Sequence, residues 1–397
     1  MSLNLTPSSE RIHIAFFGLR NAGKSSLVNA VTGQSLSVVS DVAGTTTDPV
    51  RKTMELLPIG PVVIIDTPGF DDSGSLGELR VRKTMEILGK TDIAVFVRDA
   101  SQEISDAEKE LISVFEKNKI PFVTALNKSD ITGDIKAEGV NEISVSAKTG
   151  HNIYELKELI AKKVKTETDK KALVSDLVNQ GDTVLLVIPI DKAAPKGRLI
   201  LPQQMVIREL LDNGITVVVS RDSELRDTVS KLKNAPALVI TDSQVFGKVA
   251  EILPDNIPLT SFSILMARYK GELQILIDGA KALSSLKDSD KILISEGCTH
   301  HRQCGDIGSV KIPAWIESFT GTKPEYHFTS GGEFPEDIEK YSLVVHCGGC
   351  MLNEREMHTR IERCRIKNVP IVNYGILIAH THGILKRSTE IFRNITL

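Results

Sequence analysis

The sequence contains few cysteines and little net charge. Five of its 397 residues are cysteine, and all five lie after residue 297. A secreted disulfide scaffold would be short and dense in cysteine, so that class is excluded, and the clustering points to metal or redox chemistry. The net charge of −3 provides no broad basic surface for nucleic acid. We therefore expect no nucleic-acid partner.

Long apolar runs are also absent. No stretch reaches the length of about 18 uninterrupted apolar residues that a membrane-spanning helix needs. The segment 1–11 lacks the apolar core of a secretion signal. We expect a cytoplasmic protein with no membrane partner. Hydrophobic residues at 41% and charged residues at 25% are typical of globular domains, and the length favours three of them.

Apolar runs that alternate with helix-like segments predict an α/β fold throughout. Runs at residues 12–17 and 62–65 are typical of buried parallel strands joined by crossover helices. A second region opens with a strand-like run at 184–190, and residues 264–286 are predicted to be helical and to bridge to the third region. In the third region, predicted strands run directly into cysteines or turns. We expect domains at residues 8–168, 176–264 and 265–397.

A phosphate-binding motif follows the first predicted strand. Residues 18–25 match G-x-x-x-x-G-K-[ST], in which backbone N–H groups surround phosphates. Lys24 would place positive charge at the β- and γ-phosphates, and the Ser25 hydroxyl would ligate Mg²⁺. Asp66-Thr-Pro-Gly69 follows another strand, which places Asp66 near Mg²⁺ and the Gly69 amide near the γ-phosphate.

Two further motifs predict guanine specificity. In Asn127-Lys-Ser-Asp130, the Asp130 carboxylate can accept hydrogen bonds from the N1 and N2 hydrogens of guanine, a donor pair that adenine lacks. Ser146-Ala-Lys148 would supply a backbone contact to the base oxygen. These motifs predict binding of GTP and GDP with Mg²⁺, and GTP hydrolysis. The expected nucleotide-binding residues are Gly18, Asn21, Ala22, Gly23, Lys24, Ser25, Ser26, Asp66, Gly69, Asn127, Lys128, Asp130, Ser146, Ala147 and Lys148.

The polar segment 41–48 has the composition of a switch that orders on the γ-phosphate through a threonine–Mg²⁺ contact. Thr46 is the expected ligand, with Thr45 and Thr47 as alternatives. Here the chain resembles the large bacterial GTPase group that includes tRNA-modification and ribosome-assembly GTPases, which share the pattern Gly-Thr-Thr-x-Asp.

Phe70 stands where many signalling GTPases carry a glutamine that orients water, and its ring cannot polarise water. Asn21 resembles the asparagine that helps some members of this bacterial group bind K⁺ in place of an arginine finger. The alternative is that Asn21 only suits the backbone angles of the turn. We expect hydrolysis to be K⁺-activated, with Lys24, Asn21, Thr46 and Gly69 as the catalytic residues.

Two cysteine segments, 298–304 and 346–350, follow predicted strands in the third region. Cys347-x-x-Cys350 can place two thiolates on one metal centre, and Cys298 would add a third at the same edge of the sheet. Three thiolates with a variable fourth position suit a 4Fe-4S cluster, a Cys₃His set suits zinc as well, and ordinary buried thiols are a third option. The roles of His301 and Cys304 stay open. Cys364 lies in a run predicted to be helical, residues 354–366, and is predicted to be a core residue.

Cys298-x-His300, separated by 45 residues from His346-Cys347-x-x-Cys350 and placed behind a GTPase, resembles the FeFe-hydrogenase maturation GTPases over all three regions. The resemblance implies a GTP-binding domain, a middle domain that makes a homodimer and a C-terminal domain with a 4Fe-4S cluster. It implies that Cys298, Cys347 and Cys350 are cluster ligands, with His300 or His346 as candidates for the fourth.

The resemblance also implies a function and partners. The protein would be a scaffold and carrier that assembles or delivers the di-iron subcluster, built with two radical-SAM maturases, to the apo-FeFe-hydrogenase. The alternative is an RNA-modification or ribosome-assembly GTPase with a zinc-stabilised C-terminal domain. The third region carries one tryptophan and no basic run, which favours the carrier over the RNA-binding alternative.

Overall fold

The computed structural model describes residues 6–34, 50–70, 83–133, 139–167, 171–190, 199–297, 306–393 and 395–396. The chain divides into two compact units, Met1–Lys170 and Lys171–Leu397. Within these residues, the first unit contains one sheet of six strands, and the second contains two sheets of four strands each. The predicted α/β fold class is confirmed. The predicted three-domain layout is confirmed as well, with one sheet in each domain and the second and third domains together in the second unit.

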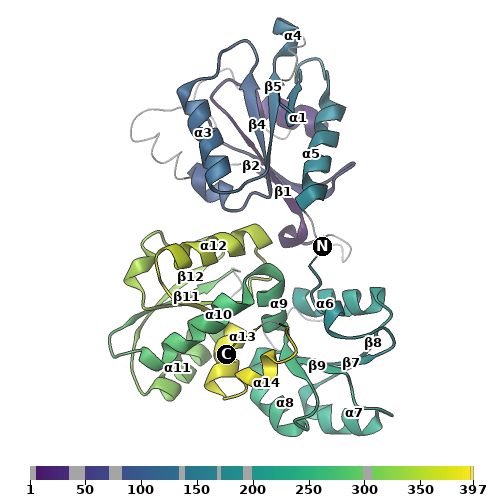
Figure 1. Ribbon diagram of the computed structural model, residues 1–397, viewed down its shortest axis with the longest axis vertical. Helices are drawn as coiled ribbons and strands as arrows, with labels where there is room; N and C mark the ends of the chain where they lie inside the picture. Colours follow the sequence, from purple (N-terminus) through teal and green to yellow (C-terminus); the bar gives the residue numbers. More distant parts are fainter. Residues whose placement is uncertain are drawn as a thin grey trace. The chain divides into compact units, whose positions relative to one another are not determined.

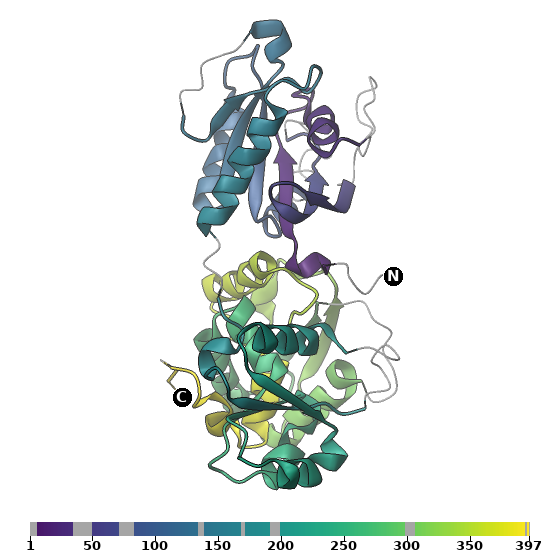
Figure 2. The ribbon, with the colours of Figure 1, turned by 90° about the vertical axis from the view of Figure 1, so that its right-hand side faces the viewer.

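In the first unit, the sheet has the order β2-β3-β1-β4-β5-β6. All neighbouring strands are parallel except β2, which pairs antiparallel with β3. Successive residues of β1 face opposite sides: Ile14 and Phe16 join a core with α1 and α5, whereas Ala15 and Phe17 join a core with α3. Helices therefore cover both faces of the sheet (Figure 1, Figure 2). The elements are η1 (Ser8–Glu10), β1 (Ile12–Phe17), α1 (Lys24–Thr32), β2 (Val50–Leu56), β3 (Gly60–Asp66), β4 (Ile93–Asp99), α3 (Asp106–Lys117), β5 (Phe122–Asn127), α4 (Ser129–Thr132), β6 (Glu142–Ser144) and α5 (Ile153–Glu167).

The first sheet of the second unit is entirely parallel, with the order β10-β9-β7-β8. Its central strands are rich in valine, leucine and isoleucine and are buried on both faces. The elements are η2 (Ser175–Leu177), β7 (Thr183–Val187), α6 (Leu201–Asp212), β8 (Thr216–Ser220), η3 (Asp222–Glu224), α7 (Leu225–Lys231), β9 (Leu238–Thr241), η4 (Ser243–Val245), α8 (Phe246–Ile252), β10 (Leu259–Ser261) and α9 (Phe262–Lys270).

The second sheet of this unit is also parallel, with the order β12-β11-β13-β14. One continuous hydrophobic core, from Leu173 to Phe392, includes side chains of both sheets. The elements are α10 (Leu273–Ala280), η5 (Lys281–Ser285), β11 (Lys291–Glu296), η6 (Ile307–Lys311), α11 (Ile312–Thr320), β12 (Glu325–Ser330), η7 (Ile338–Lys340), β13 (Leu343–His346), α12 (Glu354–Ile366), β14 (Ile371–Asn373), α13 (Tyr374–Thr381) and α14 (Leu385–Thr389).

Residues 264–286 are largely helical, as predicted, but they do not form one continuous helix. The structure has three segments there, α9, α10 and η5. Gly271 ends α9 because its backbone is extended, with φ −139° and ψ −160°, and glycine is among the weakest helix formers. Within the described part of the chain, no helix combines the length and apolar character needed to cross a membrane.

Candidate functional site

The phosphate-binding loop connects the end of β1 to the start of α1. Gly23 has φ +88°, and a Cβ there would lie 2.3 Å from Asn127 Nδ2, so the loop admits only glycine at this position. Because α1 begins at Lys24, its first N–H groups face the loop and can bind phosphate. The ammonium group of Lys24 donates to the carbonyl oxygens of Gly18 at 3.0 Å and Leu19 at 2.7 Å. This cation therefore lies directly against the loop.

The two residues of this region that the sequence predicts to lie at Mg²⁺, Ser25 and Asp66, are in contact. The Ser25 hydroxyl donates to Asp66 Oδ2 at 2.6 Å. Asp66 is 3% exposed, and its Oδ1 is buried with no hydrogen-bond partner among the described residues. A buried carboxylate oxygen without a partner calls for a ligand. Mg²⁺ prefers hard oxygen ligands and keeps several waters, so this hydroxyl–carboxylate pair fits that ion.

The predicted guanine-binding motif, residues 127–130, contacts the phosphate-binding loop through Asn127. Its Nδ2 donates to the carbonyl oxygen of Ala22 at 3.0 Å, and its Oδ1 accepts the N–H of Ala147 at 3.0 Å. Ser146 Oγ donates to Asp130 Oδ1 at 2.7 Å, which orients that carboxylate. The structure thus brings three motifs that are far apart in the sequence to one edge of the sheet, as expected for the carboxyl ends of parallel strands.

The remaining predicted nucleotide residues flank this edge. Lys128 has φ +72° and donates to Asp99 Oδ2 at 2.6 Å. The Lys148 side chain is 85% exposed, and its ammonium group lies 4.0 Å from Asp130 Oδ2. Ser26 lies in the first turn of α1.

Asn21 has φ +61°, a conformation that asparagine tolerates better than most residues. Gly69 lies against the backbone of Arg20, because a Cβ at Gly69 would be 3.1 Å from the Arg20 nitrogen. Phe70 packs against the hydrophobic core under α3. The predicted Mg²⁺ ligand Thr46 and its alternatives, Thr45 and Thr47, lie outside the described residues.

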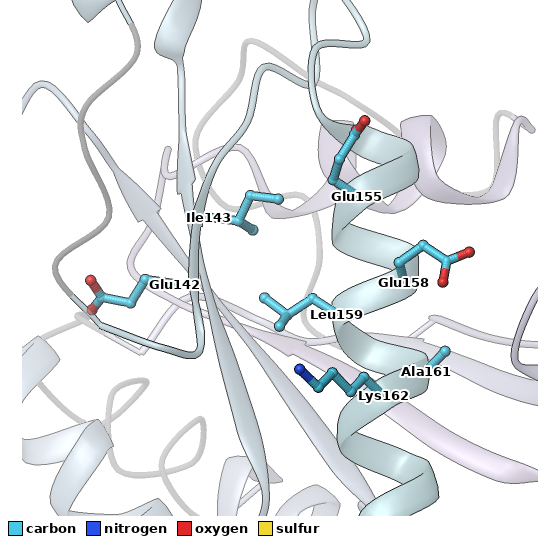
Figure 3. Close-up of a pocket in the computed structure, with 7 residues that line it drawn as sticks. All are labelled: Glu142, Ile143, Glu155, Glu158, Leu159, Ala161 and Lys162. Carbon is cyan, nitrogen blue, oxygen red and sulfur yellow. The ribbon is translucent and has the colours of Figure 1, made fainter.

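A separate pocket of about 670 Å³ lies between β6 and α5. Figure 3 shows Glu155 and Glu158 on the helix and Glu142 on the far side of the strand. Lys162 is the one cation among the lining residues, so acidic groups predominate and would repel phosphate. This pocket is therefore unsuitable for a nucleotide.

In the second unit, the cysteine loop, which we define as residues 347–352, begins where β13 ends. Ser295 of β11 pairs with His346 of β13, so these two strands end beside each other. The Cys347 sulfur accepts the N–H groups of Gly297 at 3.0 Å and Gly349 at 3.4 Å. Such N–H contacts to sulfur stabilise a thiolate and tune iron–sulfur sites.

Burial raises the pKa of the Cys347 thiol to about 11, against the opposing effect of these N–H groups. A bound metal ion would lower this pKa, since a coordinating thiol is deprotonated outright, and the two N–H groups act in the same direction. Cys350 is half-buried in the same loop. Cys298, His300, His301 and Cys304 lie outside the described residues, and within the described ones no group of three or more metal-binding side chains is found.

The fully buried His346 has both ring nitrogens engaged. Nδ1 lies 2.8 Å from the Cys347 carbonyl oxygen and Nε2 lies 3.0 Å from Arg360 Nη1. A carbonyl only accepts and a guanidinium only donates, so Nδ1 carries the proton. Burial and the Arg360 charge lower the pKa of His346 to about 3, so the ring is neutral. To ligate a metal through Nε2, His346 would have to lose its hydrogen bond from Arg360.

Sequence reasoning missed Arg360. This guanidinium is buried and donates to Glu356 Oε1 at 2.6 Å and to the Gly331 carbonyl oxygen at 2.9 Å. The i,i+4 spacing of Glu356 and Arg360 within a predicted helix was the available signal. Cys364 of α12 is fully buried in the core, and burial raises the pKa of its thiol to about 12.

The GTPase region is similar to curated bacterial GTPases. The tRNA modification GTPase MnmE of Endomicrobium trichonymphae is 37% identical over 160 residues, which cover 38% of this chain and 35% of that protein. GTPase Der of Wolinella succinogenes is 35% identical over 167 residues, with coverage of 38% and 35%. The chain thus spans about a third of the length of these relatives. Among solved structures, a variant of Aquifex aeolicus Era bound to GDP·AlF₄⁻ has 18% identity, covers 53% of this chain and 92% of its own, and gives a TM-score of 0.36.

Three family models match consecutive parts of the chain. Residues 13–128 match the 50S ribosome-binding GTPase model. Residues 173–271 match the hydrogen maturase F dimerization domain, and residues 274–391 match the hydrogen maturase F tetramerization domain. The two maturase models together span nearly all of the second unit. With its GTPase domain followed by both of these domains, the chain belongs to the hydrogen maturase F family.

Proposed function

We propose that this protein is a GTP-hydrolysing scaffold and carrier that assembles or delivers the di-iron subcluster of FeFe-hydrogenase to the apo-enzyme. The observation that carries the proposal is the cysteine loop at the end of β13, in a domain of the maturase family. The Cys347 sulfur already accepts two backbone N–H groups there. Cys298, Cys347 and Cys350 would hold a 4Fe-4S cluster, with His300 or His346 as candidates for the fourth position.

When bound, the cluster would supply an iron with an exchangeable position to which a di-iron precursor can attach. The chain's own contribution is to hold the thiolates and to exclude water from them. Burial of Cys347 and its N–H contacts support this role. The cargo, the apo-hydrogenase and the two radical-SAM maturases are proposed as partners. The two maturase models are named for dimerization and tetramerization, which supports a self-associating chain, with a homodimer formed by residues 176–264.

Anaerobic reconstitution with iron and sulfide tests the cluster. We expect the wild-type chain to bind about four irons, with 4Fe-4S absorption and EPR spectra. Cys347→Ala and Cys350→Ala should each lose most of the bound iron. Cys364→Ala is the matched control, because that thiol is fully buried in the core, and it should retain the cluster. A colourless wild-type protein with stoichiometric zinc would refute the carrier proposal.

That zinc outcome would favour the second candidate, an RNA-modification or ribosome-assembly GTPase. Its support is the similarity of residues 13–128 to a ribosome-binding GTPase model and to MnmE and Der. Those two alignments cover 38% of this chain, whereas the maturase models lie in the second unit. We therefore favour the carrier.

For the nucleotide site, we propose GTP hydrolysis with Mg²⁺ on Ser25, Asp66 and Thr46, activated by K⁺ near Asn21. We expect turnover in K⁺ to exceed turnover in Na⁺ by roughly tenfold or more at equal ionic strength, because a cation beside the transferring phosphoryl group stabilises its charge. Asn21→Gly separates the alternatives, since glycine also tolerates φ +61°. Loss of K⁺ activation in this variant supports the carboxamide as a ligand. Equal rates of the wild-type protein in both salts would refute K⁺ dependence.

A further inference from the structure

Helix α9 contacts the cysteine loop although it belongs to a different segment of the chain. It follows β10 of the middle sheet directly, and it lies within the residues that match the dimerization model. The cysteine loop connects β13 to α12 within the tetramerization match. Two contacts, one near each end of α9, join these parts.

The first contact is at the start of α9. Asn373 Nδ2 donates to the Ser263 carbonyl oxygen at 2.8 Å, and the Gly375 N–H donates to Ser263 Oγ at 3.2 Å. These bonds fix α9 to the junction of β14 and α13. Gly348 of the cysteine loop lies against the same serine, because a Cβ at Gly348 would be 3.4 Å from Ser263 Oγ. The loop therefore rests on the first turn of α9.

The second contact is at the last residue of α9. The Lys270 side chain is almost fully buried, at 2% exposure. Its ammonium group donates to the Leu352 carbonyl oxygen at 2.7 Å and lies 3.5 Å from the Cys350 carbonyl oxygen. These carbonyls are in a loop outside any helix or strand, so Lys270 supplies hydrogen bonds that regular structure does not. Burying an ammonium group is costly, and a lysine is rarely buried without a specific role.

We propose that Lys270 is a positioning residue for the cysteine loop, which fixes the backbone at Cys350 and places a positive charge against the loop that carries the thiolates. The inference rests on the proposed cluster function for its electrostatic part only. A reduced cluster with thiolate ligands is more negative than the oxidised one, so a nearby cation stabilises the reduced form and raises the reduction potential. Because Lys270 lies within residues 173–271, which match the dimerization model, this part of the chain contacts the proposed cluster site directly.

Three variants of the full-length chain test this proposal. Lys270→Met removes the charge and the donors while preserving length, Lys270→Arg keeps both, and Lys270→Gln keeps a donor without the charge. Lys281→Met is the control, because that side chain is 59% exposed and its ammonium group pairs with Asp278 near the end of α10. Hydrogen exchange of a peptide spanning residues 347–353 in the cluster-free protein measures how well the backbone amides of the loop are protected. We expect exchange about tenfold faster in Lys270→Met, near wild type in the other variants, and unchanged at α13 throughout.

The reduction potential of the reconstituted cluster reports the charge. Lys270→Met and Lys270→Gln should lower it by about 59 mV, which is a tenfold change in the one-electron equilibrium. Lys270→Arg and Lys281→Met should stay near the wild-type potential. Wild-type loop exchange in Lys270→Met would overturn the positioning role, and wild-type potentials in the two uncharged variants would overturn the electrostatic role. A wild-type chain that binds no cluster refutes the proposed function, while the exchange measurement still decides the positioning role.

Discussion

At the scale of single residues, the sharpest prediction concerns Asp130. Asp130→Asn replaces a pair of acceptors with an amide that donates, so it cannot accept both guanine hydrogens. We expect GTP affinity to fall by roughly 100-fold and xanthosine triphosphate affinity to rise, since hydrogen bonds to charged groups contribute about 1.5–3 kcal/mol. Fluorescent-nucleotide titration measures both. Asp106→Asn is the control, because the Asp106 side chain is 99% exposed. Unchanged GTP affinity in Asp130→Asn would contradict the proposed role of Asp130.

Residue-level prediction anticipated proximity where two motifs share one expected ligand. The motifs predicted that Ser25 and Asp66 would both lie near Mg²⁺, and the structure places these two side chains in contact; the Ser146–Asp130 hydrogen bond was not predicted. It failed where the partner comes from another element. Nothing near His346 in the sequence indicates Arg360, whose position depends on the packing of α12 against β13.

At the scale of elements, hydrophobic runs found most of the buried strands and missed strands that are largely polar or very short. β2 and β12 contain charged or polar residues at most positions, and β6 and β10 have three residues each, too short to show a period. The helix predicted at residues 354–366 has the same bounds as α12. Asn353 fixes where this helix begins, because its side chain caps the helix by accepting the Glu356 N–H.

The first turn of α12 gives a pH prediction. The hydrogen bond with His358, 3.5 Å away, and the ion pair with Lys171 lower the pKa of Glu354 to about 2, although burial opposes the shift. A carboxylate with a depressed pKa adds stability above its unfolded pKa of about 4.5, and that stability is lost as pH falls toward 2.

We therefore expect cluster-free Glu354→Gln to unfold at lower urea concentration than wild type at pH 5, and the gap to close as pH falls toward 2. Urea titrations at several pH values check this. When both chains also carry Lys171→Met, Glu354 has lost one of its two partners, so the difference in urea midpoint caused by Glu354→Gln at pH 5 should be smaller. A gap that is constant from pH 5 to pH 2.5 would show that Glu354 does not titrate as proposed.

At the scale of the whole molecule, the order β10-β9-β7-β8 leaves β8 at an edge of the described sheet. An edge strand presents unpaired backbone groups that can pair with another chain. Val219 in β8 is 52% exposed, an apolar side chain on that edge. These features support the proposed homodimer, in which two β8 strands would meet by symmetry.

Val219→Lys tests this arrangement. A symmetric contact would bring the two introduced ammonium groups close together, and edge lysines oppose strand pairing, so we expect self-association of the full-length chain to weaken by about tenfold or more. Light scattering after size-exclusion chromatography, over a range of protein concentrations, measures the mass. Val140→Lys is the matched control, because Val140 is 93% exposed in the first unit and should leave the mass unchanged. If Val219→Lys keeps the wild-type mass at every concentration, the chains associate through a surface other than β8.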